Sequence, residues 1–191
     1  AAGEIDVVEA CVWALVEIAW KQEFQDEALA ALDRLAKSSE SPAAKLAESE
    51  ARKLRMTDEE RAIEALEAAG VEVRRNSQGD VTNLNLSQDA QLKWIRHLPN
   101  LSFVFWRGNG ITNGGLELLS KSKTVRAVSI SDTAVTDVGF AFLGDLPALR
   151  AFYFSGNQIS AFGIRRLAAS KSLSRVSWKS KLDLAGLEAI S

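Results

Sequence analysis

Cysteine and histidine are almost absent from this chain, and their scarcity excludes several kinds of chemistry. The 191 residues include one cysteine, Cys11, and one histidine, His97. A single cysteine can form neither an internal disulfide nor a zinc site of several cysteines. A single histidine argues against a histidine metal cluster and against a Ser-His-Asp arrangement. We therefore expect no metal, no cofactor and no catalytic residues, with Cys11 a small buried apolar group and His97 a surface or boundary residue.

A long hydrophobic run and an excess of one charge are also lacking. The most apolar stretch, Val7 to Trp20, has 14 residues and contains Glu9 and Glu17, whereas a membrane-spanning helix needs about 20 apolar residues. The formal net charge of −2 provides no positive field for nucleic acid. We expect a soluble chain with no membrane span and no nucleic-acid partner. The start, Ala1-Ala2-Gly3, leaves open an export signal removed by processing, and with it an extracytoplasmic compartment.

The charges that are present divide the chain into two parts. Residues 1–80 have 10 Lys/Arg against 18 Asp/Glu, and residues 99–191 have 11 against 6. Such a difference suggests separate structural units. The pattern predicts a helical region over residues 1–56, a helical cap over 57–80 and a repeat region over 81–191. In the cap, Thr57-Asp58-Glu59-Glu60 reads as a capping box, and Gly70 is a typical helix stop.

The first predicted helix is apolar on two sides. No proline or glycine occurs between Ile5 and Lys37, and alanine, leucine and glutamate dominate there. Two apolar stripes follow helical spacing: Ile5, Val8, Val12, Leu15 and Ala19 form one, and Trp13, Val16, Trp20 and Phe24 form the other. A helix that is apolar on two faces must be covered on both. We therefore expect Trp13, Val16 and Trp20 to make a contact with another subunit.

A repeat of 24 residues occupies the second half of the chain. Each unit starts with an apolar residue, carries two more at strand spacing, and continues to a glycine and a leucine. The aligned positions are Leu101, Val125, Leu149 and Leu173; Val104, Val128, Phe152 and Val176; Trp106, Ile130, Phe154 and Trp178; Gly115, Gly139 and Gly163; and Leu119, Leu143 and Leu167. A shorter unit precedes them at Val81, with Leu84 and Leu86 as its strand positions. A unit of this size can bury its apolar face only by stacking on its neighbours.

The repeat resembles the leucine-rich repeat family. The segment Val135-Thr136-Asp137-Val138-Gly139-Phe140 is similar to the helix-bearing 24-residue subtype of bacterial "VTDAGL" arrays and cysteine-type repeats. The resemblance covers roughly residues 57–191 and implies an α/β solenoid of about four and a half units. A parallel sheet would then form the concave side and helices the convex side.

Alternation along the strands separates an inward from an outward set of side chains. Trp106, Phe152, Phe154 and Trp178 are expected in the core. The outward set forms three columns: Asn83, Phe103, Ala127, Ala151 and Arg175; Asn85, Phe105, Ser129, Tyr153 and Ser177; and Ser87, Arg107, Ser131, Ser155 and Lys179. We expect the glycines after each turn to let a helix start close to the sheet.

Seven outward residues are the candidate partner-binding site: Phe103, Phe105, Arg107, Ser129, Tyr153, Arg175 and Lys179. Phe105 and Tyr153 would stand roughly 10 Å apart across a shallow pit, since strands lie about 4.8 Å apart. Aromatic residues beside arginine suit a protein or peptide partner, and the cationic edge suits acidic groups on it. Two other interpretations remain open: the aromatics pack on each other across strands, or the N-terminal helices cover them.

The leading hypothesis is a non-enzymatic scaffold that binds a protein or peptide on the concave face. An alternative is a structural subunit that docks into a larger assembly through the N-terminal apolar helix. A third is an accessory region of a multidomain protein whose catalytic part lies elsewhere.

Overall fold

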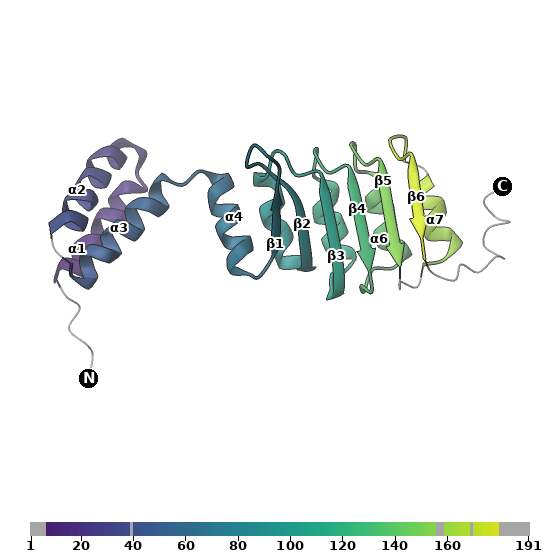
Figure 1. Ribbon diagram of the computed structural model, residues 1–191, viewed down its shortest axis with the longest axis horizontal. Helices are drawn as coiled ribbons and strands as arrows, with labels where there is room; N and C mark the ends of the chain where they lie inside the picture. Colours follow the sequence, from purple (N-terminus) through teal and green to yellow (C-terminus); the bar gives the residue numbers. More distant parts are fainter. Residues whose placement is uncertain (1–6, 39, 156–158, 169, 180–191) are drawn as a thin grey trace. The chain divides into compact units, whose positions relative to one another are not determined.

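The computed structural model of the chain describes residues 7–38, 40–155, 159–168 and 170–179 (Figure 1). Contacts divide the chain into two compact units, which we call the helical unit, Ala1–Arg61, and the sheet unit, Ala62–Ser191. Helices form the first, and a mixed six-stranded sheet with helices forms the second. The α/β class and the helical N-terminal region are therefore confirmed. The last predicted half-unit, residues 180–191, lies outside the described residues.

The helical unit consists of α1 (Val7–Ala19), η1 (Gln22–Phe24), α2 (Gln25–Ser38) and α3 (Pro42–Arg55). Ser41 caps α3, because its hydroxyl accepts a hydrogen bond from the Ala44 N–H at 3.2 Å and Pro42 occupies the first turn. The three α-helices share one apolar core, which is formed by Val12, Val16, Ala19, Ala28, Leu32, Ala47, Ala51 and Leu54.

Only one side of α1 packs into that core, which corrects two expectations. Val16 is 8% exposed and belongs to the core of its own unit, so it is not available to another subunit. Trp13 and Trp20 are 47% and 69% exposed. Cys11 is exposed, not buried. The reason is helical geometry: the buried side is set by Val12, Val16 and Ala19, and Cys11 is rotated about 100° away from Val12.

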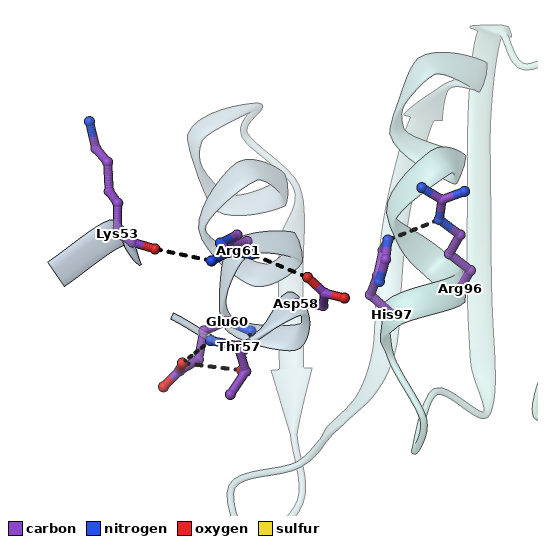
Figure 2. A network of polar contacts seen from close by, with 7 residues as sticks. All are labelled: Lys53, Thr57, Asp58, Glu60, Arg61, Arg96 and His97. Carbon is purple, nitrogen blue, oxygen red and sulfur yellow. Dashed lines mark hydrogen bonds and ion pairs between the residues drawn. The ribbon is translucent and has the colours of Figure 1, made fainter. Parts of the chain in front are cut away.

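Helix α4 (Asp58–Ala68) begins in the helical unit and continues into the sheet unit. The predicted capping box is present: the Thr57 N–H donates to Glu60 Oε2 at 2.7 Å, and the Glu60 N–H donates to Thr57 Oγ1 at 3.2 Å (Figure 2). Gly70 ends the helix with a φ of +72°, in the left-handed region that a helix stop uses. Ala62 and Leu66 of α4 are fully buried in the core of the sheet unit.

The sheet has its strands in sequence order: β1 (Glu72–Arg75), β2 (Val81–Gln88), β3 (Phe103–Gly110), β4 (Ala127–Ser131), β5 (Ala151–Ser155) and β6 (Arg175–Trp178). β1 is antiparallel to β2, and the others are parallel. The crossovers are η2 (Asp89–His97), α5 (Asn113–Ser120), α6 (Asp137–Gly144) and α7 (Ala161–Ala168). Figure 1 shows these helices behind the strands and shows a sheet that is not curled. We call the other side, which carries none of these helices, the open face.

Strand β1 lies in the second part of the predicted cap, residues 57–80, after the helix that Gly70 ends, and it was not expected. A tight turn joins it to β2: the side chain of Asn76 accepts hydrogen bonds from the N–H groups of Gln78 and Asp80, both at 2.9 Å. Gly79 has a φ of +91° in this turn. The strand escapes a pattern search because its four residues, Glu-Val-Arg-Arg, include one apolar side chain.

The core alternates along the parallel strands as expected. Val104, Val128, Ile130, Phe152 and Phe154 are at most 3% exposed. The ring of Phe140 on α6 meets Phe152 and Phe154 edge-on, with centroids 5.0 and 5.5 Å away. The helices and the strands therefore pack against each other around one continuous apolar core.

Trp178 departs from this alternation. It lies at an inward position and stacks on Phe154 with centroids 6.4 Å apart, yet it is 43% exposed. Because β6 is the last strand that the structure describes, Trp178 has no following strand beside it within residues 7–179. Trp178 therefore has the predicted inward position, but the expectation that it is buried in the core is wrong.

A ladder of side chains joins each helix start to the next. We call it the repeat ladder: a carboxylate or amide at one helix start binds both the N–H and the hydroxyl of a residue 23 positions later. Its pairs are Asp89 with Thr112 at 3.0 and 2.6 Å, Asn113 with Thr136 at 2.9 and 2.9 Å, and Asp137 with Ser160 at 2.8 and 2.5 Å. The hydroxyl of Thr136 accepts from Asn113 and does not cap its own helix, whereas those of Thr112 and Ser160 also accept from the N–H two residues later.

The repeat ladder explains the repeated glycines. A Cβ at Gly139 would lie 2.5 Å from Asn113 Oδ1 and 2.8 Å from Leu116 Cδ1, and one at Gly163 would lie 2.5 Å from Asp137 Oδ1. A Cβ at Gly115 would overlap the carboxylate of Asp89 in the same way. The absent Cβ therefore makes room for the preceding repeat's polar side chain, whereas we expected it to allow close approach to the sheet.

Candidate interaction surface on the open face

Residues that were predicted to share a column do pair with each other across neighbouring strands of the sheet. Phe103 pairs with Ala127, Ala127 with Ala151, and Ala151 with Arg175. The second column runs from Asn85 through Phe105, Ser129 and Tyr153 to Ser177. In the third, Arg107 pairs with Ser131 and Ser131 with Ser155. The register of β2 shifts between Leu86 and Gln88, which takes Ser87 out of this column.

Three side chains form what we call the aromatic cluster: Phe103, Phe105 and Tyr153. The ring of Phe103 lies 4.0 Å from that of Phe105 and 6.2 Å from that of Tyr153, centroid to centroid. All three are half-buried. The expectation of an open pit between Phe105 and Tyr153 is therefore wrong, because the ring of Phe103 contacts both of their rings. The small side chains of Ala127 and Ala151 in the column of Phe103 leave it room to lean across, so cross-strand packing does occur here.

A pocket of about 210 Å³ opens beside the aromatic cluster, and Tyr153 is a wall of both. Its other lining residues are Ser129, Ser131, Phe154, Ser155, Ser177 and Lys179. The hydroxyls of Ser131 and Ser155 lie 2.7 Å apart across β4 and β5. The backbone N–H of Lys179 donates to the Phe154 carbonyl at 3.1 Å, which ties this residue to the end of β5. Serine hydroxyls can donate as well as accept, so the pocket can meet an oxyanion.

The charges on the open face are unbalanced. Arg107, Arg175 and Lys179 are exposed, and no ion pair joins them to a carboxylate within the described part of the chain. The one acidic strand residue on this face is Glu72 of β1, opposite Asn85. Glu72 is already engaged, since it accepts from Arg74 Nε at 2.8 Å and from the Asn85 amide. Sequence reasoning missed Glu72 because β1 itself was not expected.

A second hollow lies between α4 and η2, on the helix side of the sheet unit. It has a volume of about 500 Å³ and is lined by Ala65, Ala69, Ser87, Gln88, Ala90, Gln91, Lys93 and Trp94. The Nζ of Lys93 lies 4.9 Å from the centroid of the Trp94 ring, which is a cation–π distance. Its α4 wall consists of alanines, and its polar groups come from Ser87, Gln88, Gln91 and Lys93.

His97 takes part in a local contact at the end of η2. Its Nε2 accepts from Arg96 Nε at 2.9 Å, as Figure 2 shows, and its ring lies 6.4 Å from that of Trp94. No group of three or more His, Cys, Asp or Glu residues able to hold a metal occurs among the residues described. Within the same ranges, no helix is long and apolar enough to cross a membrane.

Comparison with known proteins adds no assignment. No protein-family model matches the chain, and no curated protein matches it.

Proposed function

We propose that the chain is a non-enzymatic scaffold of the leucine-rich repeat type that binds a protein or peptide on its open face. The coincidence of the 24-residue spacing with strand pairing supports the repeat assignment: Val104, Val128 and Phe152 are 24 residues apart and pair in register. The three residue pairs of the repeat ladder recur at the same 24-residue spacing, since they start at Asp89, Asn113 and Asp137. A family that stacks one strand and one helix per unit accounts for both.

The observation that carries the proposal is the aromatic cluster. Phe103, Phe105 and Tyr153 lie half-buried on the side of the sheet that bears none of the crossover helices. Large aromatics that remain partly open to solvent on the same face as exposed arginines have the composition of an interface centre. A purely structural cluster would not need the exposed arginines and lysine around it.

The mechanism is presentation of a preformed surface. The strands that carry the cluster are held by parallel pairing, by the apolar interior behind them and by the repeat ladder. The face therefore loses little conformational entropy when a partner binds, which leaves more of the contact energy for affinity.

A random peptide library displayed on phage tests the proposal directly. The full chain, the double variant Phe105→Ala/Tyr153→Ala and the control Phe162→Ala are used as targets. Phe162 is 57% exposed on α7, on the helix side, so its loss removes an aromatic without touching the open face. We expect peptides selected on the wild-type chain to bind the control equally and the double variant at least about tenfold more weakly. Equal binding to all three would refute the proposal.

A second candidate function is supported by α1. Its outward residues Val7, Trp13, Ile18 and Trp20 are all more than two-fifths exposed, which is unusual for side chains of this size. In this alternative, the helix docks into another subunit of an assembly. Sedimentation velocity of the isolated chain separates the cases: a species larger than the monomer, dissociated by Trp13→Ser/Trp20→Ser, supports docking, and a monodisperse monomer counts against it.

A further inference from the structure

We propose that the open face selects partners carrying a carboxylate two to four residues from an apolar side chain, with the carboxylate held between Arg107 and Lys179. The inference rests on the proposed function, because it specifies the chemistry of the partner for the same surface. It combines three observations: a row of hydroxyls, a surplus of cations on the same face and the position of the aromatic cluster beside them.

The hydroxyl row is the third column of the sheet. Ser131 and Ser155 lie side by side on β4 and β5, with Arg107 on the strand before them and Lys179 at the end of the strand after them. Because neighbouring strands are about 4.8 Å apart, the backbones at Arg107 and Lys179 are roughly 14 Å apart. Both long side chains can reach a group that rests on the two serines. Ser131 and Ser155 share one hydrogen bond at 2.7 Å, and this leaves one hydroxyl proton free to donate to an acceptor placed on them.

The surrounding charge favours an anion in that position. The strand positions of the open face carry three cations, Arg74, Arg107 and Arg175, against Glu72, and Lys179 directly follows β6. Glu72 is neutralised by Arg74, so three cations remain. Asp132 follows β4 in a turn and does not line the pocket. A carboxylate from the partner would therefore meet charge-assisted hydrogen bonds and little repulsion.

The aromatic cluster sets the spacing that the partner must have. Tyr153 borders both the pocket and the cluster, and the second and third columns are two residues apart along each strand, or about 6.6 Å. An extended peptide covers that distance in two residues, and a helix brings residues three or four apart onto one side at similar separation. An apolar residue on Phe103 and Phe105 then places an acidic residue over Ser131 and Ser155.

Aromatics and cations together also suit single-stranded nucleic acid. The observations favour the peptide, because three cations on a chain of net charge −2 make a weak electrostatic footprint. Nucleic acid is therefore kept as an outcome of the test.

The experiment reads the sequences of peptides selected from the random library on the full chain. We expect enrichment of an aspartate or glutamate two to four positions from an apolar residue. Binding of these peptides should fall about tenfold or more in Arg107→Glu/Lys179→Glu and should weaken as salt is raised. The control is Lys121→Glu, which changes the charge of one residue by the same amount. Lys121 lies at the C-terminal cap of α5, on the helix side of the sheet. Arg107, Lys179 and Lys121 are exposed, so the variants should keep the melting temperature of the wild type.

Each other outcome overturns the inference in a recognisable way. Peptides that need Phe105 and Tyr153 but show no acidic enrichment, or bind the charge-reversed variant equally, refute the acidic partner and leave the proposed function standing. Peptides indifferent to Phe105→Ala/Tyr153→Ala refute both. A fluorescent single-stranded oligonucleotide that binds the wild-type chain and is lost in Arg107→Glu/Lys179→Glu assigns the face to nucleic acid.

Discussion

The carboxylate of Asp137 accepts two hydrogen bonds from one residue in the next repeat, from the Ser160 N–H at 2.8 Å and from its hydroxyl at 2.5 Å. Asp89 accepts the same pair of hydrogen bonds from Thr112. Asn113 accepts one from the Thr136 N–H and donates one from its amide to the Thr136 hydroxyl. The repeat ladder satisfies a free N–H at each helix start with a group from the preceding unit. The stability of neighbouring repeats is therefore coupled through side chains as well as through the core.

Removing one such carboxylate should destabilise the sheet unit. We expect Asp137→Ala to lower the free energy of unfolding by about 1–2 kcal/mol, because two charge-assisted hydrogen bonds are lost at an exposed site. Asp137→Asn is the matched control, since Asn113 performs the same task in the repeat before it. Urea unfolding of the three proteins measures this, and equal losses in Ala and Asn variants would contradict the ladder.

Two adjacent glycines should respond in opposite directions to alanine. A Cβ at Gly115 would overlap Asp89 and lie 2.9 Å from Leu92 Cδ1, whereas a Cβ at Gly114 meets nothing closer than Thr112 Oγ1 at 3.5 Å. We expect Gly115→Ala to lower the free energy of unfolding by about 1–3 kcal/mol, because the added methyl group overpacks this contact. Gly114→Ala should be neutral or stabilise by up to about 1 kcal/mol, since alanine favours the helix. Thermal and urea unfolding compare them, and a similar loss in both would argue against the close contact.

Neighbouring residues of β3 test the two faces of the sheet. Trp106 is 1% exposed in the core, and Phe105 beside it is half-buried on the open face. We expect Trp106→Ala to lower the free energy of unfolding by about 3–5 kcal/mol. Phe105→Ala should lower it by about 1–2 kcal/mol, because this variant loses ring contacts without opening a cavity. Equilibrium unfolding in urea gives both numbers. A larger cost at Phe105 than at Trp106 would show that the faces are exchanged.

The start of α4 should respond to acid. Hydrogen bonds from the Thr57 backbone and side chain hold the pKa of Glu60 below its ordinary value of 4.5. A carboxyl whose pKa is lower in the folded state stabilises that state above the unfolded pKa, and this contribution is lost as pH falls through the folded pKa. We expect Glu60→Gln to flatten the pH dependence of thermal stability below about pH 4.5, since an amide oxygen still accepts but does not titrate.

Asp33 provides the comparison for that measurement. A hydrogen bond from Arg55 at 2.6 Å lowers the pKa of Asp33, so its contribution fades in the same direction with acid. The Glu60→Gln variant keeps this second contribution and should therefore retain part of the slope. An unchanged profile in Glu60→Gln would show that the capping box adds nothing to the pH dependence.

Asp132 occupies a backbone conformation that glycine holds one repeat earlier. Its φ is +53°, and Gly108, 24 residues before it, has a φ of +99°. We expect Asp132→Ala to be less stable than Asp132→Gly by about 1 kcal/mol, because a Cβ is unfavourable in the left-handed region. Urea denaturation compares the two variants directly. Equal stabilities would indicate that the turn relaxes to another conformation.

Local pattern was enough for much of this protein. The 24-residue spacing predicted the pairing of Phe103 with Ala127 and of Phe105 with Ser129, since the side-chain period of a strand leaves one register with an apolar interior. The same holds for the capping box at Thr57 and Glu60 and for the helix stop at Gly70. These features depend on residues close in sequence or on strict periodicity, so the order of the residues is enough to predict them.

Tertiary packing decided the remainder. The ring of Phe103 packs near that of Tyr153 two strands away, Cys11 is exposed on α1, and β1 pairs with β2 although it has a single apolar residue. The polar partner of each repeated glycine also became visible only in space, because Asp137 and Ser160 meet across 23 residues. Periodicity predicts the face of the sheet or helix on which a side chain lies. Which side chains it contacts there depends on three-dimensional distances, and these cannot be read from the order of the residues.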